Sequence, residues 1–329
     1  MVLPMRINSN RVDVQSRSHT ISESESKEKV AVARLSIFSN ISLTILKLCV
    51  GLVSGSVSIL SEAIHSGMDL IASMIAYLSV QRSGEPPDTQ HAYGHGKYED
   101  ISGLIEAILI FIAGFIIIYE AVEKTLHPHE FVSSHLLIGI IVMGISAVMN
   151  LFVSRQLMKI AKKTNSIALE GDAWHLKTDI YTSAGVMGGL IVVYITGISL
   201  FDPLIAIAVA LIILKTSMSL IKRSYEDLTD YSLSEEERKS IEEIVLQYKE
   251  KIVNMHDLKT RRAGPEIFIE FHIAVDGNMS VHYAHTLIDT IEGALLNRFQ
   301  RASVTIHLES CEENCNTCTA QCHDNRFWN

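Results

Sequence analysis

Two histidine–aspartate pairs stand out because each lies inside a long apolar stretch of the chain. His65 and Asp69 are four residues apart, and His175 and Asp179 repeat this spacing much later. On a helix, residues four apart lie on the same face, so each pair presents an imidazole and a carboxylate together. Two imidazole nitrogens and two carboxylate oxygens suit a tetrahedral divalent ion, Zn²⁺ above all. The pattern therefore predicts one intramembrane metal site formed by two helices.

Two other interpretations of these pairs exist. Each histidine could be a buried, hydrogen-bonded packing residue, or the four groups could form a proton relay without metal. Ionisable side chains are costly inside a membrane and usually serve function there, and the repetition of the pair favours a metal. The sequence lacks the His-Glu-x-x-His spacing of zinc proteases, which disfavours hydrolysis. We therefore expect a protein that moves or senses a metal, and not an enzyme.

Long apolar segments must position these residues, because a helix needs about 20 mostly apolar residues to cross a bilayer. Apolar residues make up 48% of the chain, and six segments qualify, at about residues 35–53, 57–80, 101–122, 136–157, 168–195 and 200–221. Lys and Arg concentrate before the first segment, between the second and third, between the fourth and fifth, and after the sixth. The positive-inside rule then places both termini in the cytoplasm. A net charge of −9 argues against nucleic acid as a partner.

The chain divides by composition into four parts. We expect residues 1–30 to form a disordered cytoplasmic arm, residues 31–224 to form the six-helix membrane domain, and residues 225–309 to form a cytoplasmic domain. In the latter, Ser234 and Glu237 have the spacing of a capping box that opens a helix to about residue 251. Strands at 253–262, 267–275 and 302–308 and an amphipathic helix at 281–299 complete the order α-β-β-α-β. This order predicts a small α+β sandwich with its helices on one face.

Residues 310–329 form a cysteine-rich tail that contains Cys311, Cys315, Cys318 and Cys322. Four thiolates can close a tetrahedral zinc site, and the cytoplasm would keep them reduced. An iron–sulfur cluster is the chemical alternative, and a disordered tail with incidental cysteines is the structural one. We favour metal capture because the four cysteines lie so close together.

A polar loop between the second and third apolar segments carries Asp88, His91 and His95. Carboxylate and imidazole groups at this spacing are a moderate signal for a metal site, and a solvated polar loop is the alternative. Gly94 and Gly96 would let the backbone turn tightly around the imidazoles.

The intramembrane pairs and the loop sequence Asp88-Thr-Gln-His-Ala-Tyr-Gly-His-Gly-Lys-Tyr-Glu99 resemble those of the cation diffusion facilitator family. The resemblance covers about residues 35–309. It implies six membrane helices, a cytoplasmic ferredoxin-like domain, and a homodimer that exchanges a divalent metal for protons. It also implies that the two pairs form the transport site and that the loop forms a second metal site. The chain has His65 where many bacterial zinc members have aspartate.

The resemblance further implies a two-metal site at the dimer interface of the cytoplasmic domain, and a charge pair near the membrane surface. The residues that match the interface site are His256, His272, His285, His307 and Glu309. Those that match the charge pair are Lys97 and Asp230.

These observations predict a carrier in a bacterial inner membrane that exports a divalent cation from the cytoplasm by proton antiport with alternating access. Zn²⁺ is the first choice of substrate and regulatory ligand, with Fe²⁺, Cd²⁺ and Co²⁺ as chemical alternatives. A metal-gated channel would use the same ligands without moving protons, and a membrane metal sensor would bind metal without flux. A membrane metalloenzyme would need a general base beside an open metal site, for which the sequence shows no spacing.

Overall fold

The computed structural model describes residues 9–54, 57–126, 136–196 and 201–311. The chain forms two compact units. One contains Glu25–Glu226, and the other contains Asp227–Asn329 together with Met1–Ser24. Each unit is described below by itself.

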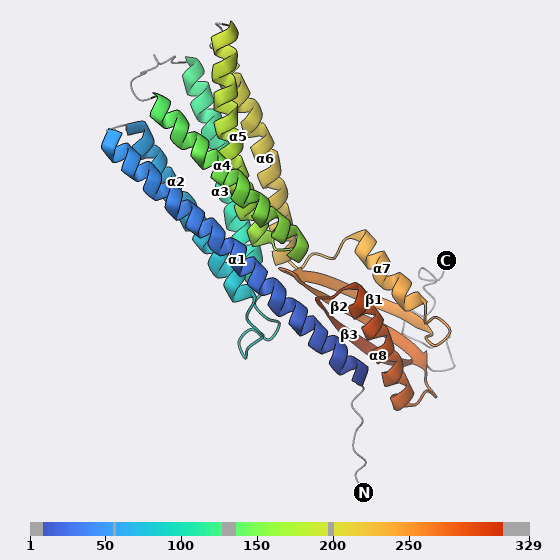
Figure 1. Ribbon diagram of the computed structural model, residues 1–329. Helices are drawn as coiled ribbons and strands as arrows, with labels where there is room; N and C mark the ends of the chain where they lie inside the picture. Colours follow the sequence, from blue (N-terminus) through green and yellow to red (C-terminus); the bar gives the residue numbers. More distant parts are fainter. Residues whose placement is uncertain (1–8, 55–56, 127–135, 197–200, 312–329) are drawn as a thin grey trace. The chain divides into compact units, whose positions relative to one another are not determined.

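Long helices build the first unit (Figure 1). They are α1 (Ser9–Ser54), α2 (Val57–Ser83), α3 (Lys97–Leu126), α4 (Leu136–Thr164), α5 (Ile167–Thr196) and α6 (Phe201–Leu228). The residues of α1 before Glu25 and the last two residues of α6 belong to the other unit. Within the described residues, four stretches are long and apolar enough to cross a membrane: Ser24–Val53, Lys97–Glu123, Ile141–Thr164 and Pro203–Leu228. The described residues of α2 and α5 provide no such stretch, and these are the two helices that carry the His–Asp pairs. The structure thus supports four of the six predicted spans by composition and shows long helices at all six.

Helices α3 and α5 pack closely because glycines face bulky neighbours. A Cβ atom added at Gly103 in α3 would lie 3.1 Å from the side chain of Ile167, at the start of α5. A Cβ added at Gly171 in α5 would lie 3.1 Å from the Cβ of Glu106 in α3. Small residues let membrane helices approach each other, so these two helices are held at short range next to His175.

The structure differs from the expectation of a disordered arm at residues 1–30, because α1 already begins at Ser9. Lys29 is 2% exposed and forms an ion pair with Glu99 at the start of α3. The second carboxylate oxygen of Glu99 accepts a hydrogen bond from the hydroxyl of Ser166. A buried lysine is tolerated only with such a partner, and the polar composition of the segment gave no sign of that partner.

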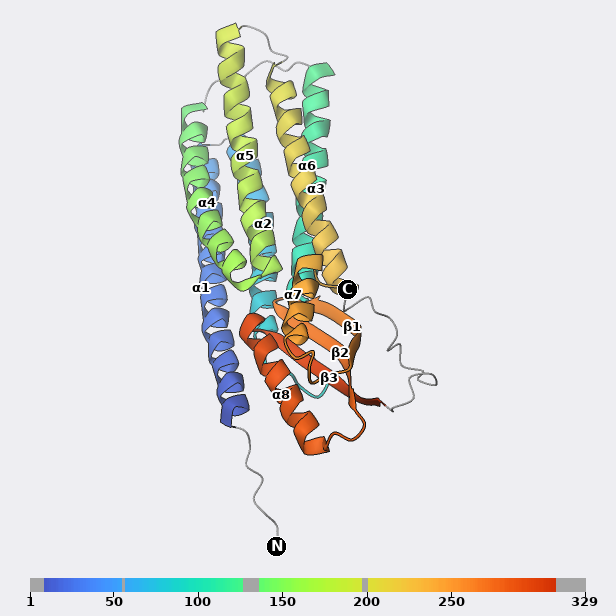
Figure 2. The same ribbon diagram turned by 90° about the vertical axis from the view of Figure 1, so that its right-hand side faces the viewer.

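The second unit contains α7 (Glu235–Leu246), β1 (Asn254–Ala263), β2 (Glu266–Asp276), α8 (Val281–Arg298) and β3 (Ala302–Cys311). The sheet has the order β1-β2-β3, with β1 antiparallel to β2 and β2 parallel to β3. Helices α7 and α8 lie over the sheet (Figure 2), and the core between them is apolar, with fully buried Ile241, Ile269, Ile273, Ile291 and Leu295. The predicted order of elements is confirmed.

Helix α7 begins as predicted and ends earlier than predicted. The Ser234 side chain accepts a hydrogen bond from the backbone N–H of Glu237, and the Glu237 side chain accepts one from the backbone N–H of Ser234. This is the predicted capping box. The helix ends at Leu246, with Gln247 as its C-cap, and the chain then forms turns up to residue 251 where the prediction continued the helix.

Candidate metal centres

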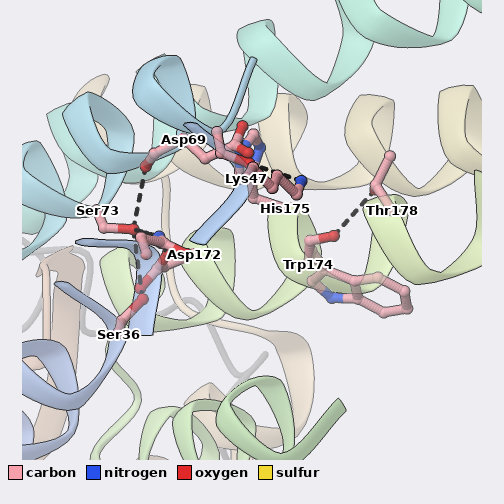
Figure 3. Close-up of polar contacts among 10 residues, drawn as sticks. Ser36, Lys47, Asp69, Ser73, Asp172, Trp174, His175 and Thr178 are labelled. Atoms are coloured by element: carbon pink, nitrogen blue, oxygen red, sulfur yellow. Dashed lines mark hydrogen bonds and ion pairs between the residues drawn. The ribbon is translucent and has the colours of Figure 1, made fainter. Parts of the chain in front are cut away.

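The first candidate centre joins helices α2 and α5. His175 Nε2 lies 3.0 Å from Asp69 Oδ1, and one ligand atom from each of Asp69, His175 and Asp179 lies within 4.8 Å of the others. Asp69 is 6% exposed, and His175 and Asp179 are half-buried. Figure 3 shows Asp69 and His175 approaching each other from their two helices. His65 belongs to α2, but its side chain lies outside the described residues.

Polar groups surround this centre on the side of Asp172 (Figure 3). The Ser73 hydroxyl lies 3.2 Å from the backbone oxygen of Asp69 and 3.2 Å from Asp172 Oδ1. Lys47 in α1 donates a 2.7 Å hydrogen bond to the Ser66 hydroxyl. Asp172 was not among the predicted site residues. Its signal in the sequence is its position three residues before His175, which places it on the same helical face.

The second candidate centre is the polar loop, which brings together Asp88, His91 and His95 as predicted. Asp88 Oδ1 lies 3.3 Å from His91 Nδ1, and Asp88 Oδ2 lies 3.3 Å from His95 Nε2. His95 is 2% exposed, and neither of its ring nitrogens makes a hydrogen bond to a described residue. Gly94 has a φ of +87°, a conformation that favours glycine, so the predicted turn at this residue is observed.

The charge of Asp88 suits a ligand. Its Oδ1 accepts hydrogen bonds from the backbone N–H groups of His91, at 2.6 Å, and Gln90, at 2.8 Å. These bonds, with that of His91 first, hold the pKa of the Asp88 carboxyl below its usual value. Hydrogen bonds to the ionised form stabilise it, so Asp88 stays available as an anionic ligand in mildly acidic conditions.

The third candidate centre lies on the sheet of the second unit. Glu309 bridges two histidines, because its Oε1 lies 2.9 Å from His272 Nδ1 and its Oε2 lies 3.3 Å from His256 Nε2. One ligand atom of each of these three residues lies within 4.8 Å of the others. The ring of His307 stacks beside that of His272, with centroids 4.7 Å apart.

Strand register explains this cluster. His256 pairs with His272 across β1 and β2, and His272 pairs with His307 across β2 and β3, so the three histidines form one row across the sheet. Their neighbours in β2, Phe271 and Ile273, are buried in the core under the helices. Because side chains alternate between the two faces of a strand, the histidine row lies on the face away from the helices.

His285, the remaining histidine of the predicted interface site, does not join this cluster. It lies on α8, is 63% exposed, and its Nδ1 lies 3.3 Å from Asp289 Oδ2. Helix α8 packs on the core face of the sheet, and this placement separates it from the histidine row within one chain. Asp257, which was not predicted, does approach the row, with its Oδ2 3.6 Å from His272 Nε2.

Two further predictions concern other parts of the chain. Asp230 forms an ion pair with Arg261 inside the second unit, at 3.5 Å, and its pairing with Lys97 stays a prediction. Cys311 ends β3. The other three tail cysteines, Cys315, Cys318 and Cys322, lie outside the described residues, and so does any metal site that they form.

Comparison with known proteins agrees with this architecture. Residues 33–229 match the family model described as the cation efflux transmembrane domain. Residues 233–311 match the one described as the cation efflux protein cytoplasmic domain. A long helical membrane unit with ionisable residues, followed by a cytoplasmic unit with a small mixed sheet, defines the class as membrane transporters of metal cations.

Individual relatives cover most of the chain. An uncharacterized transporter of Synechocystis sp., sll1263, is 36% identical over 281 residues, which cover 85% of this chain and 90% of the relative. The cation-efflux pump FieF of Shewanella oneidensis is 31% identical over 275 residues, which cover 84% of this chain and 92% of the pump. A solved structure of the candidate zinc transporter CzrB is 40% identical, covers 25% of this chain and 100% of its own, and has a TM-score of 0.24.

The chain therefore belongs to the cation diffusion facilitator family of cation efflux proteins. It is an integral membrane protein with a role in the efflux of metal cations.

Proposed function

We propose that the protein exports a divalent cation, with Zn²⁺ as first choice, in exchange for protons and by alternating access. The convergence of Asp69, His175 and Asp179 carries this proposal, because imidazole and carboxylate ligands on two helices suit such an ion. His65 would complete a four-ligand set. In this proposal all six long helices cross a bacterial inner membrane, and both termini are cytoplasmic.

The contact between His175 and Asp69 supports proton coupling. Its 3.0 Å length is that of a hydrogen bond, and such a bond needs a proton on the nitrogen or on the oxygen. A metal ion that binds His175 Nε2 must displace this proton, because metal ligands bind in their deprotonated forms. In the proposed cycle the ion enters from the cytoplasm and releases the proton. After the helices rearrange, a proton from outside replaces the ion.

The other two centres would have regulatory or metal-supplying roles. The row of His256, His272 and His307 with Glu309 lies on a face of the sheet that α7 and α8 do not cover. A second chain could therefore approach it, as in the homodimer that the family resemblance implies. The loop centre at Asp88 would bind the same class of ion. We also propose that the second unit has the ferredoxin-like arrangement and that the cysteine tail captures metal.

Flux in proteoliposomes tests the proposal directly. Purified protein is reconstituted with a zinc dye and a pH dye inside the vesicles, and Zn²⁺, Cd²⁺, Fe²⁺ and Co²⁺ are added in turn. We expect metal entry coupled to proton exit. Asp179→Ala should abolish both, while Glu120→Gln, which removes an exposed carboxylate in α3, should leave both unchanged. Metal entry without proton movement would indicate a metal-gated channel, and binding without entry would indicate a sensor.

A further inference from the structure

A second buried carboxyl lies close to the proposed transport centre and is not one of its ligands. Glu106 in α3 is 0% exposed, and neither of its carboxyl oxygens makes a hydrogen bond with any residue that the structure describes. Asp172 in α5 is also 0% exposed, and among the same residues its Oδ2 has no hydrogen-bond partner. Burying an ionised carboxylate without a partner costs several kcal/mol or more, so these three oxygen atoms require a ligand.

Packing directs Glu106 toward the transport centre. Its side chain lies on Gly171, where an added Cβ would be 3.7 Å from Glu106 Oε2, and Asp172 is the next residue of α5. Glu106 lies within electrostatic reach of Asp172 and His175, and Asp172 lies within electrostatic reach of His175 and Asp69. The remaining partners of Asp172 are uncharged, namely the hydroxyls of Ser73 and Ser36 (Figure 3).

A proton fits this environment better than a metal ion. The described donor atoms that converge within 4.8 Å in the membrane helices are those of Asp69, His175 and Asp179, and neither Glu106 nor Asp172 belongs to that group. Two ionisable groups of α5 lie near Glu106, and each already has another partner. Asp172 accepts a hydrogen bond from Ser73, and His175 contacts Asp69. Because His175 is paired with Asp69, it does not balance two further charges, and two neighbouring buried carboxyl groups cannot both ionise at low cost, so one of them keeps a proton.

We propose that Glu106, beside Asp172, is a proton-binding site of the transporter, separate from the metal ligands and loaded in opposition to them. The inference rests on the proposed proton antiport. When a divalent ion binds Asp69, His175 and Asp179, its two positive charges neutralise the buried acidic groups. The O–H bond of the Glu106 carboxyl then breaks, and its proton passes to water. When the ion leaves, Glu106 takes up a proton from water and the neutral state is restored.

The Ser102 hydroxyl lies on a route by which the Glu106 proton can reach water. Ser102 lies one helical turn before Glu106 on α3, is 1% exposed, and its oxygen also makes no hydrogen bond within the described part of the chain. Residues four apart share a face of a helix, so Ser102 extends the polar line from Glu106 toward the beginning of α3. A hydroxyl both donates and accepts hydrogen bonds, as a group that relays protons must.

The test compares Glu106→Gln with the wild type and with the exposed control Glu120→Gln. Protons released per Zn²⁺ bound are measured by titration calorimetry of the full chain in buffers of different ionisation enthalpy. The pH dependence of Zn²⁺ flux is measured in proteoliposomes. We expect Glu106→Gln to bind Zn²⁺ with an affinity within about threefold of wild type, to release about one proton fewer per ion, and to lose part of the pH dependence of flux.

Each outcome decides a different claim. Proton release and a pH profile equal to those of the wild type would overturn the role of Glu106, even if antiport itself is observed. A wild-type protein that moves Zn²⁺ without protons would overturn the proposed antiport instead. Glu106→Asp keeps a carboxyl at the same position and should retain proton release. If Glu106→Gln does not fold, a Glu106→Asp variant that releases one proton fewer than wild type would contradict the proposal.

Discussion

The substitution Asp69→Asn changes the charge of the proposed transport centre with little change in shape. Asn can still accept a hydrogen bond through its side-chain oxygen, so the contact with His175 Nε2, 3.0 Å long in the wild type, has a substitute. The variant loses one negative charge in a site that is almost fully buried, since Asp69 is 6% exposed. Any loss of metal binding therefore reports mainly on electrostatics.

The size of the effect follows from the geometry. A carboxylate and an ion about 4 Å apart, at an effective dielectric constant of about 20, attract each other by about 4 kcal/mol per unit charge on the ion. A tenfold change in affinity corresponds to about 1.4 kcal/mol. If only one unit of charge on the ion is considered, Asp69→Asn should weaken Zn²⁺ binding at this centre by about a thousandfold.

The assay is initial Zn²⁺ flux into proteoliposomes over a range of Zn²⁺ concentrations, because binding at the loop and at the sheet would obscure a direct titration. We expect the KM of Asp69→Asn to rise so far that flux is barely measurable, while the variant elutes as the wild type does from a sizing column. Glu120→Gln serves as the control. A KM within about threefold of wild type would show that Asp69 does not bind the transported ion.

Three other changes test separate parts of the structure. His272→Ala should weaken metal binding at the sheet by at least about tenfold, while Zn²⁺ flux across the membrane continues. Complete loss of flux would contradict a regulatory role for this centre. Burial raises the pKa of Glu242, so ionisation of this side chain lowers the stability of the wild type as pH rises from the unfolded pKa to the folded one. In thermal melts with chelator, the melting temperature of Glu242→Gln minus that of the wild type should therefore be larger at pH 8 than at pH 4. Lys29→Met leaves the buried charge of Glu99 without its opposite charge and should cost roughly 3–5 kcal/mol, whereas Lys29→Met combined with Glu99→Gln should recover most of the melting temperature.

Local features of the structure could be predicted because they depend on neighbours in sequence. The capping box at Ser234 and Glu237 involves residues three apart. The loop cluster of Asp88, His91 and His95 needs only one tight turn, which Gly94 provides. The sheet strands could be placed to within a few residues by their composition. Hydrophobic patterning and turn chemistry act over such short distances, so the sequence itself carries the signal.

Burial of charge was not predictable in the same way. The segment around Lys29 is polar and mixed in charge, and this composition indicated disorder. In the folded unit Lys29 is buried because Glu99, far away in the sequence, provides the opposite charge. For the same reason, the sequence did not predict that oxygens of Glu106 and Asp172 are buried without hydrogen bonds to described residues. That burial results from the packing of α3 against α5.

The sequence by itself determined that His175 and Asp179 share a helical face, since helical periodicity places residues four apart together. Only the tertiary structure decided that Asp69 of α2 meets them. Likewise, the sequence determined that His256, His272 and His307 lie in strands. The register of the sheet decided that they form one row beside Glu309 and that His285 on α8 lies apart from it. Contacts between distant segments depend on how whole helices and strands pack, and no local spacing specifies that packing.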